Sequence, residues 1–258
     1  MCGIVGYTGY RKANEVLING LLKLEYRGYD SAGMATIEKN KIIINKEKGR
    51  VANLQNLDSV KNLSGTLGIA HTRWASHGFP CKENAHPHMD CYNTFAVVHN
   101  GIIENFSELK SFLQGYEYTF KSQTDTEVIT YLFDHLLRHH NLPIEVAADV
   151  LTAPEWEEID KMDDDRKEYF TNLRSIYNGA LVNGPFSVIL GSNKGLLAIN
   201  DRLKLRSLTA ATKGNRAYFA SEESAIRIIC PDPEKVWSVS GAEPVFIPLE
   251  IDDEEVED

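Results

Sequence analysis

The chain has 258 residues, of which 43% are hydrophobic and 25% are charged, so it is long enough to bury a large core. No apolar run approaches the roughly 20 residues of a membrane span, and the N-terminus lacks the pattern of a signal peptide. We therefore expect a soluble, cytoplasmic protein that does not act at a membrane. Four scattered cysteines without a CxxC pair argue against a disulfide framework and a zinc knuckle, and we expect no cofactor.

The net charge of −10 comes from two short segments. Residues 155–167 carry seven acidic and three basic side chains, and residues 252–258 carry six acidic side chains and no basic one. The rest of the chain has 24 acidic and 24 basic residues, so it lacks the basic surface that nucleic acids require. An acidic tail of this kind is usually a solvated, disordered end.

Apolar periodicity predicts the order of elements along the chain, beginning with a strand from residue 2 to residue 7 and a helix over residues 12–25. Four further strands are expected at 31–37, 41–46, 66–70 and 94–99. A short helix over 105–114 precedes a helix that begins at Thr124-Asp-Thr-Glu127, a capping-box pattern. The stretch from 142 to about 176 is helical in propensity and rich in charge. Strands return at 185–191, 195–200, 217–221, 235–239 and 244–248.

This order of strands, helices and again strands includes several connections short enough for hairpins. It predicts an α+β fold with packed sheets and outer helices, rather than a doubly wound parallel sheet. No internal repeat or Pro/Gly/Ser linker divides the chain. We therefore expect one domain over residues 1–250, with a helical acidic insertion at about 142–180, and an acidic tail at 251–258.

A cysteine directly behind the initiator methionine is the first candidate for chemistry. Cysteine is small enough for methionine removal to be expected, and Cys2 would then carry both a thiol and a free α-amine. An α-amine with a pKa of about 7.7–8.0 can activate a neighbouring thiol near neutral pH without a histidine. Taken alone, Cys2 is more commonly explained as a small buried hydrophobic residue.

Two polar segments follow strands that are expected to be buried. His71-Thr-Arg-Trp-Ala-Ser-His77-Gly78 is dense in hydrogen-bond donors, and the planar fork of Arg73 suits a carboxylate. The alternative is a buried Trp74 with ordinary loop neighbours. In His99-Asn100-Gly101, a side-chain amide donor and an unhindered glycine N–H are suited to an oxyanion hole. The same Asn-Gly pair is equally typical of a hairpin turn.

Two further groups leave more than one explanation open. Asp125 lies in the first turn of a predicted helix, where an acidic side chain is electrostatically favourable, but it could also pair with a substrate ammonium group. His86, His88 and His99 could form a metal site. The extended geometry of His-Pro-His and the absence of a conventional ligand spacing, except for Asp90, argue against such a site.

Taken together, these segments resemble the class II glutamine amidotransferases, which are N-terminal-nucleophile hydrolases. The matching segments are Met1-Cys-Gly-Ile-Val-Gly-Tyr7, Leu24-Glu-Tyr-Arg-Gly-Tyr-Asp-Ser-Ala-Gly33, His71–Gly78, Asn84-Ala-His-Pro-His88, Val97-Val-His-Asn-Gly-Ile-Ile-Glu-Asn105 and Ser122-Gln-Thr-Asp-Thr-Glu127. They cover the first half of the chain in the family's order and are most similar to the glutaminase domain of glucosamine-6-phosphate synthase. In the second half, Asn183–Ser187, Asn200–Leu208 and Phe219–Ala225 look more like the glutaminase part of glutamate synthase.

The resemblance implies a four-layer αββα sandwich and a set of residue roles. Cys2 attacks the carboxamide of L-glutamine with its own α-amine as base, and Asn100 and Gly101 form the oxyanion hole. Arg73 holds the substrate α-carboxylate, and Asp125 holds its α-ammonium group. The implied supporting residues are Arg27, Trp74, Thr72 and His77.

The sequence ends soon after this pattern and leaves no room for a sugar isomerase, a phosphoribosyltransferase or a flavin-binding synthase. We therefore expect a separate glutaminase subunit that supplies ammonia to a glutamate-synthase-like partner, with an oligomeric assembly left open. One alternative is a free-standing glutaminase half of a glucosamine-6-phosphate synthase. Another, from a different functional class, is a non-catalytic regulatory subunit that binds glutamine.

Overall fold

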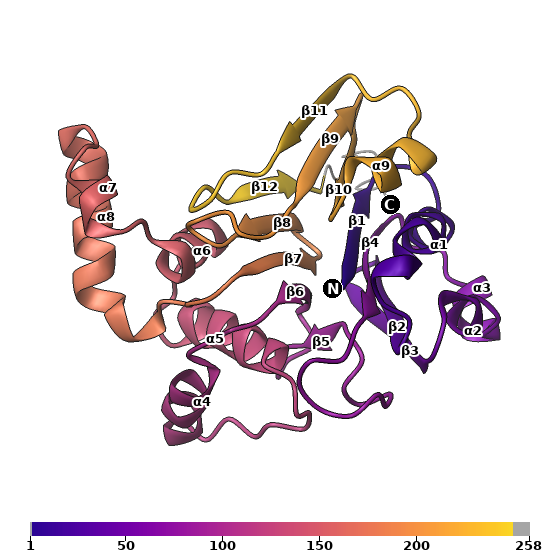
Figure 1. The fold of residues 1–258 in the computed structure, drawn as a ribbon, viewed down its shortest axis with the longest axis horizontal. Coiled ribbons are helices and arrows are strands. Elements are labelled where there is room, and N and C mark those ends of the chain that lie inside the picture. The colour runs from indigo at the N-terminus through magenta and orange to yellow at the C-terminus, as the bar shows by residue number, and fades with distance from the viewer. Residues whose placement is uncertain (1, 250–258) are drawn as a thin grey trace, which may run out of the picture.

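The computed structural model describes residues 2–249, and the acidic tail at 251–258 lies outside the described residues. Two antiparallel sheets face each other, and helices cover the outer face of each one (Figure 1). Within the described residues, no helix is long and apolar enough to cross a membrane.

The larger sheet has seven strands in the order β11-β9-β10-β1-β4-β2-β3. Its strands are β1 (Gly3–Thr8), β2 (Ser31–Glu38), β3 (Lys41–Lys48), β4 (Leu67–Arg73), β9 (Thr209–Lys213), β10 (Arg216–Ala220) and β11 (Lys235–Ser238). The N-terminal strand β1 lies in the middle of this sheet, between β10 and β4. The N-terminus of the chain is therefore held by two neighbouring strands instead of lying at a sheet edge.

The second sheet has five strands in the order β12-β8-β7-β6-β5. Its strands are β5 (His88–Met89), β6 (Phe95–Gly101), β7 (Phe186–Ser192), β8 (Gly195–Asn200) and β12 (Val245–Pro248). The strand β6 pairs with β7, which follows it by more than 80 residues. An Asn-Gly hairpin at the end of β6 is therefore wrong, because Gly101 lies opposite Phe186.

Alternating side chains divide each strand between two apolar layers. In β1, Ile4 packs between the two sheets, whereas Val5 faces the helices outside. The outer helices of the larger sheet are α1 (Ala13–Leu24), α2 (Val51–Gln55), α3 (Asp58–Lys61) and α9 (Glu223–Ile229). A short 3-10 turn, Glu25–Arg27, follows α1. The apolar stripe of α1, which includes Val16, Leu17 and Leu21, is fully buried on this face.

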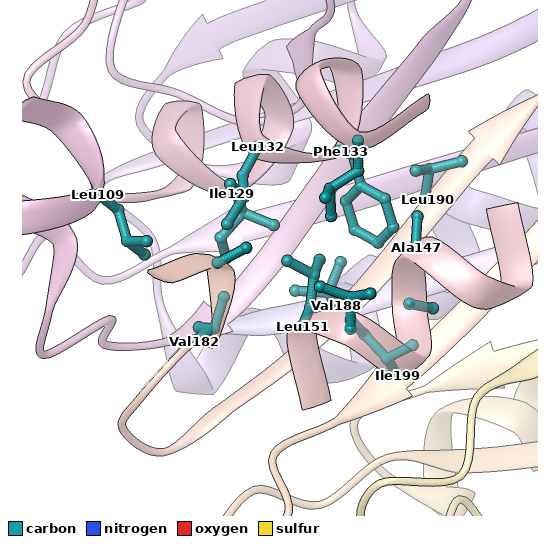
Figure 2. Close-up of a cluster of buried hydrophobic side chains, with 14 of the residues drawn as sticks. Leu109, Ile129, Leu132, Phe133, Ala147, Leu151, Val182, Val188, Leu190 and Ile199 are labelled. Atoms are coloured by element: carbon teal, nitrogen blue, oxygen red, sulfur yellow. The ribbon is translucent and has the colours of Figure 1, made fainter. Parts of the chain in front are cut away.

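The five-stranded sheet has its own helical layer. Its helices are α4 (Phe106–Gly115), α5 (Thr126–Arg138), α6 (Ile144–Thr152), α7 (Trp156–Ile159) and α8 (Asp164–Tyr177), with a 3-10 turn at Asn178–Ala180. Figure 2 shows how Phe133 of α5 and Leu151 of α6 meet Val188 and Leu190 of β7 in the core beneath these helices. The layers run helices, sheet, sheet, helices, so the predicted α+β class and the αββα sandwich are confirmed.

The stretch 142–180 is helical, as its composition indicates, but its parts differ in burial. In α6, Ala147, Ala148 and Leu151 are fully buried in the core of the outer layer. The helices α7 and α8 lie farther out, at the left of Figure 1, away from both sheets. Most of the acidic side chains of this stretch therefore lie on α7 and α8 or at the ends of these helices. Whether this stretch is an insertion into a single domain stays a prediction.

The capping box expected at Thr124 is wrong, because the helix begins two residues later, at Thr126. The carboxylate of Glu127 turns away and accepts hydrogen bonds from the backbone N–H groups of Lys121 (3.0 Å) and Ser122 (2.7 Å). These bonds to the turn engage the Glu127 carboxylate. It therefore does not make the bond back to the N-cap that a capping box requires. Asp125 therefore lies where this turn meets α5.

Candidate active site

Cys2 lies immediately before β1, at the end of the cleft between the two sheets. Strand alternation gives it the same direction as Ile4, which packs between the sheets. The Nε atom of Arg27 donates a hydrogen bond of 2.8 Å to the backbone carbonyl of Cys2. The guanidinium of Arg27 also pairs with Glu222, whose carboxylate accepts a second hydrogen bond from the hydroxyl of Tyr26. A buried arginine therefore fixes the backbone of Cys2.

Arg73 is the last residue of β4 and is 3% exposed. Its guanidinium donates to three successive backbone carbonyls of the following loop, those of His77, Gly78 (3.2 Å) and Phe79 (3.3 Å). The backbone N–H of Trp74 lies 3.4 Å from the Sγ atom of Cys2. The loop over residues 74–79 is thus folded over both the thiol and the guanidinium.

The start of this loop is held from a second side. The carboxylate of Asp30 accepts a hydrogen bond of 2.8 Å from the backbone N–H of Ala75. Gly28 lies against the loop so closely that an added Cβ would be 2.6 Å from the backbone of Arg73 and Trp74. The ring of Tyr29 meets that of Trp74 edge to face, with 5.9 Å between ring centroids. The polar, aromatic segment 25–30 therefore shapes the loop and the terminus together.

The end of β6 lies beside Cys2. Strand alternation places Asn100 with Ala96 and Val98, which pack between the sheets on the face that Cys2 shares. The Nδ2 atom of Asn100 is buried and has no hydrogen-bond partner among the described residues. A buried amide donor without an acceptor is costly unless a ligand uses it. The adjacent Gly101 has φ = +150°, and an added Cβ would collide with the carbonyl of Pro185.

Asp125 is 4% exposed and directly precedes α5. Its side chain does not cap the helix. One carboxylate oxygen accepts a hydrogen bond of 2.9 Å from the backbone N–H of Ile103, and the other lies 3.8 Å from Nδ1 of His99. A purely local capping function is therefore not what holds Asp125 in place. Its negative charge lies in the same pocket as the charge of Arg73.

These groups surround one small cavity of about 10 Å³, about the space of a single water molecule. The lining residues are Cys2, Arg73, Trp74, Ser76, His77, His86, His99, Gly101, Thr124 and Asp125. Burial raises the pKa of the Cys2 thiol, while the hydrogen bond to Trp74 and the nearby Arg73 lower it. The thiol therefore needs a base that removes its proton before it can act as a nucleophile.

Four buried histidines form a layer behind this pocket. The hydroxyl of Thr126 joins Nδ1 of His99 (3.0 Å) to Nε2 of His86 (3.1 Å), and His71 stacks on His86 at 3.9 Å. His88 bonds through Nε2 to the hydroxyl of Thr124 at 3.0 Å. Burial lowers the pKa of all four, so these imidazoles are neutral near pH 7. Three of the four use threonine hydroxyls as partners.

The structure brings together most of the residues that the sequence analysis selects. Cys2, Arg73, Trp74, His77, Gly101 and Asp125 line one pocket, and Asn100 and Arg27 lie directly beside them. Thr72 is the exception. It alternates with Arg73 and faces α1, where its hydroxyl would be 2.8 Å from a Cβ added to Gly3. Its side chain therefore does not reach the pocket.

Two contributors were not selected from the sequence. Glu222 anchors Arg27 across 195 residues, and Ser221 accepts a hydrogen bond of 3.0 Å from the backbone N–H of Ile4. Both lie in the polar run Ser-Glu-Glu-Ser that directly follows a strand. A polar cluster at a strand end is the signal that could have pointed to them.

Comparison with known proteins agrees with this geometry. Residues 55–140 match the family of glutamine amidotransferase domains. The chain is 58% identical to the glutamine–fructose-6-phosphate aminotransferase (isomerizing) of Clostridium perfringens over 134 residues, which are 52% of this chain and 22% of that protein. The enzyme of the same name from Pyrococcus horikoshii is 54% identical over 138 residues, 54% of this chain and 23% of its own length. The chain thus spans less than a quarter of these relatives.

Solved structures share the fold over almost the whole chain. A structure described as the allosteric regulatory enzyme of purine biosynthesis has a TM-score of 0.75 at 22% identity, covering 96% of this chain and 47% of that one. The glutamine phosphoribosylpyrophosphate amidotransferase of B. subtilis has a TM-score of 0.69 at 20% identity, covering 97% and 50%. The similarity in fold therefore extends well beyond the region of high sequence identity.

Proposed function

We propose that this chain is a class II glutamine amidotransferase that hydrolyses L-glutamine to L-glutamate and ammonia with Cys2 as the nucleophile, a proposal supported by the matching domain family and relatives. One observation carries this proposal. The thiol of Cys2, the guanidinium of Arg73 and the carboxylate of Asp125 line a single pocket. These groups are a nucleophile, a cation for an α-carboxylate and an anion for an α-ammonium group, and a free α-amino acid presents all three complementary features.

The first half of the reaction forms a thioester. Removal of Met1 frees the α-amine of Cys2, which takes the proton of the thiol. The thiolate attacks the carboxamide carbon of glutamine, and the amide nitrogen leaves as ammonia with the proton that the α-amine returns. During this step negative charge develops on the carboxamide oxygen. The unpartnered Nδ2 of Asn100 and the backbone N–H of Gly101 stabilise it.

The second half of the reaction hydrolyses the thioester. The α-amine of Cys2 removes a proton from water, and the resulting hydroxide attacks the thioester carbonyl. The C–S bond breaks, the thiolate regains a proton, and L-glutamate leaves. Arg27 keeps the Cys2 backbone in place in both halves through its bond to the Cys2 carbonyl. No metal is needed for either step.

Glutamine cannot enter the pocket while the loop over residues 74–79 is folded as it is, because the cavity has space for about one water. The carbonyls of His77, Gly78 and Phe79 occupy the donors of Arg73. The substrate carboxylate replaces these carbonyls, since a charged acceptor binds a guanidinium more strongly than a neutral one. Trp74 and His77 then move with the loop and close over the bound substrate.

The ammonia acceptor is a separate question. We propose a glutamate-synthase-like partner on another polypeptide, supported by the resemblance of the second half of the chain. The names of the curated relatives favour a second candidate, an aminosugar synthase that accepts ammonia on fructose 6-phosphate. Adding a purified synthase of either kind and measuring transfer of the ¹⁵N amide nitrogen separates them. Only the true partner incorporates label in preference to ammonia lost to the solvent.

The central experiment measures glutamate release from glutamine, with the intact mass of the same sample recorded. We expect release from chains that lack Met1 and none from Cys2→Ala. Cys91→Ala removes an exposed cysteine outside the pocket and serves as the matched control, with unchanged activity. Release that persists in Cys2→Ala would overturn the proposal.

A non-catalytic subunit that only binds glutamine is distinguished in the same experiment. In that case the wild-type chain without Met1 releases no glutamate, even with a synthase present. A glutamine analogue that carries an alkylating group then fails to modify Cys2. Modification of Cys2 by the analogue, protected by glutamine, supports the catalytic function instead.

A further inference from the structure

A second cavity lies outside the pocket of Cys2 and has no function in the proposed reaction. It measures about 730 Å³, which is within the usual range for small-molecule sites. It opens between the edge strands of the two sheets, β3 and β5, and is closed by the first half of α5 and the segment 116–121. None of its lining residues lines the Cys2 pocket. We call it the edge cavity.

One half-buried lysine, Lys46, faces the edge cavity. Lys46 alternates along β3 with Ile42 and Ile44, which pack between the two sheets, so its side chain points inward. Burial lowers the pKa of Lys46 to about 8, although Glu127 and Glu83 act in the opposite direction. The lysine ion pairs within residues 2–249 are those of Lys61, Lys167 and Lys213, so Lys46 has none.

The buried carboxylates around the edge cavity already have their partners. Glu127 accepts from the backbone of Lys121 and Ser122 and from the hydroxyls of Ser122 and Tyr131. Asp134 accepts from the hydroxyl of Tyr118 and from Arg138. These bonds leave little acceptor capacity for an additional cation.

Asp90 is satisfied in the same way. Its two oxygens accept the backbone N–H groups of Tyr92, Thr94 and Phe95, the hydroxyl of Thr94 and a guanidinium N–H of Arg138. The remaining charged groups at the rim, Glu83, Glu117 and Lys121, are exposed to solvent, which screens them. The half-buried ammonium group of Lys46 therefore forms no ion pair among the described residues.

The wall opposite Lys46 is rich in tyrosine. Tyr92, Tyr116 and Tyr118 line the cavity, and Tyr92 and Tyr116 are 63% and 49% exposed. Exposed aromatic rings next to a concave site commonly contact the apolar or ring part of a ligand. The edge cavity thus combines the half-buried Lys46 with an aromatic surface.

We propose that the edge cavity binds a small organic anion, whose anionic group pairs with Lys46 and whose ring or apolar part contacts Tyr92, Tyr116 and Tyr118. The anionic group is a phosphate ester or a carboxylate, which share the ability to accept from an ammonium group. A cationic ligand does not fit, because the buried carboxylates are occupied and Lys46 repels it.

The segment from Lys121 to Asp125 connects the edge cavity to the Cys2 pocket. Ser122 lines the former, Thr124 and Asp125 line the latter, and the hydroxyls of Ser122 and Thr124 are 2.9 Å apart. A ligand that contacts this segment therefore acts on the position of Asp125. This consequence rests on the proposed function, since Asp125 there binds the ammonium group of glutamine.

Binding is tested independently of any glutaminase activity. Acetic anhydride at limiting concentration labels lysines, and mass spectrometry reports the extent of labelling at each lysine. The probes are inorganic phosphate, AMP and L-glutamate at constant ionic strength. We expect AMP to protect Lys46 saturably, with labelling about tenfold lower at ten times its dissociation constant. Lys48, exposed on the same strand, is the internal control and keeps its labelling.

Two variants sharpen this measurement. Lys46→Gln abolishes binding of AMP in calorimetry, whereas Lys121→Gln at the exposed rim weakens it by no more than a few fold. Protection by L-glutamate but not by AMP assigns the site to carboxylates, and the reverse assigns it to phosphate esters. Absence of saturable protection by all three probes at 20 mM, or equal protection of Lys48, would overturn the proposal.

The coupling is tested last, in the wild-type chain. The bound probe changes the KM for glutamine, and the change disappears in Lys46→Gln. If binding is found but no glutamate is released under any condition, the proposal of a ligand site at the edge cavity is supported and the proposed function fails. If glutamate is released but a bound probe leaves the KM for glutamine unchanged, only the coupling is wrong.

Discussion

The pocket of Cys2 and the edge cavity differ in size and in the state of their polar groups. The former leaves about 10 Å³ and contains Cys2, Arg73 and Asp125, whereas the latter measures about 730 Å³ and contains Lys46 and Lys121, neither of which forms an ion pair among the described residues. The smaller pocket contains the groups that the proposed reaction uses, and loop carbonyls accept the Arg73 hydrogen bonds that we propose for the substrate carboxylate. A choice by cavity volume alone would therefore have pointed away from the proposed catalytic pocket.

The histidines between the two regions give the largest expected effect. Burial lowers the pKa of His71, His86, His88 and His99, and it lowers the pKa of His135 in α5 to about 4. Unfolded histidines titrate near about 6.5, so the unfolded chain binds more protons at lower pH. Stability is then complete above about pH 6.5 and falls below it, by about 1.4 kcal/mol per histidine between pH 7.5 and 5.5. Urea unfolding at these two pH values measures the loss, several kcal/mol in total.

A matched pair of variants separates this effect from general acid denaturation. Both ring nitrogens of His135 lack a hydrogen-bond partner among the described residues, so His135→Leu loses no bond. It should reduce the loss of stability between pH 7.5 and 5.5 by about 1.4 kcal/mol. Ile176→Leu changes an exposed apolar side chain of α8 and should leave the pH dependence as it is. Identical pH profiles for His135→Leu and the wild type would refute the explanation.

The second prediction concerns the unpartnered amide in the Cys2 pocket. Asn100→Ala removes one oxyanion donor and should lower kcat by about 10²–10³-fold, equivalent to about 3–4 kcal/mol, with little change in KM. Steady-state glutamate release measures both constants. Asn93→Ala, at the rim of the edge cavity, is the control with unchanged kcat. A large rise in KM without a fall in kcat would show that Asn100 binds the ground state instead.

The fold was predictable to the level of its layers. The short, mostly apolar runs of β1, β2 and β6 and the helical spacing of α1 are local signals that packing reinforces. The strand β9, with the sequence Thr-Ala-Ala-Thr-Lys, was missed because small residues give no amphipathic pattern, and β5 has only two residues. The short helices α2, α3 and α9 were missed as well, and their stability comes from packing on the sheet.

The site was predictable where a segment carries its own chemistry. Cys2, Arg73 and Asp125 each lie in a distinctive local pattern, and the family resemblance joined them. Glu222 lies in a polar run after a strand, but its contact with Arg27 could not be predicted, because it is set by the pairing of β10 with β1. The sequence does contain a signal for Lys46, since it is a charged residue at an inward position of a strand. The partners of a buried charge, however, are visible only in three dimensions.

The third prediction tests the proposed binding of the substrate α-carboxylate by Arg73. Arg73→Lys keeps the charge but loses the planar fork, so it also gives up the bonds to the loop carbonyls. We expect the KM for glutamine to rise about 10–100-fold, as for the loss of a charged hydrogen bond of about 1.5–3 kcal/mol, with kcat changed much less. Glutamine kinetics over a wide concentration range measure this. Arg166→Lys, on the outer helix α8, is the control. A fall in kcat alone would assign Arg73 to loop structure.

The smallest expected effect concerns the positioning of Cys2 from a distance. Glu222→Gln preserves the shape of the side chain but removes the charge that pairs with Arg27. Arg27 can still donate to the Cys2 carbonyl, so we expect kcat to fall only severalfold, equivalent to about 1 kcal/mol of transition-state stabilisation. The KM and the urea midpoint at pH 7.5 should stay unchanged.

The alkylation rate of Cys2 by iodoacetamide, measured without glutamine, decides how Glu222 acts. If Glu222 positions Cys2 through Arg27, its replacement changes this rate and kcat by the same factor, because both depend on where the thiol lies. Tyr26→Phe removes the other hydrogen bond to Glu222 but keeps the ion pair, so it should change both rates less. A change in the urea midpoint with an unaltered alkylation rate would mean that Glu222 stabilises the fold and has no part in positioning the nucleophile. The comparison with Lys46 then becomes sharper, since a cation with its anion in place holds structure, whereas one without an anion is free to bind a ligand.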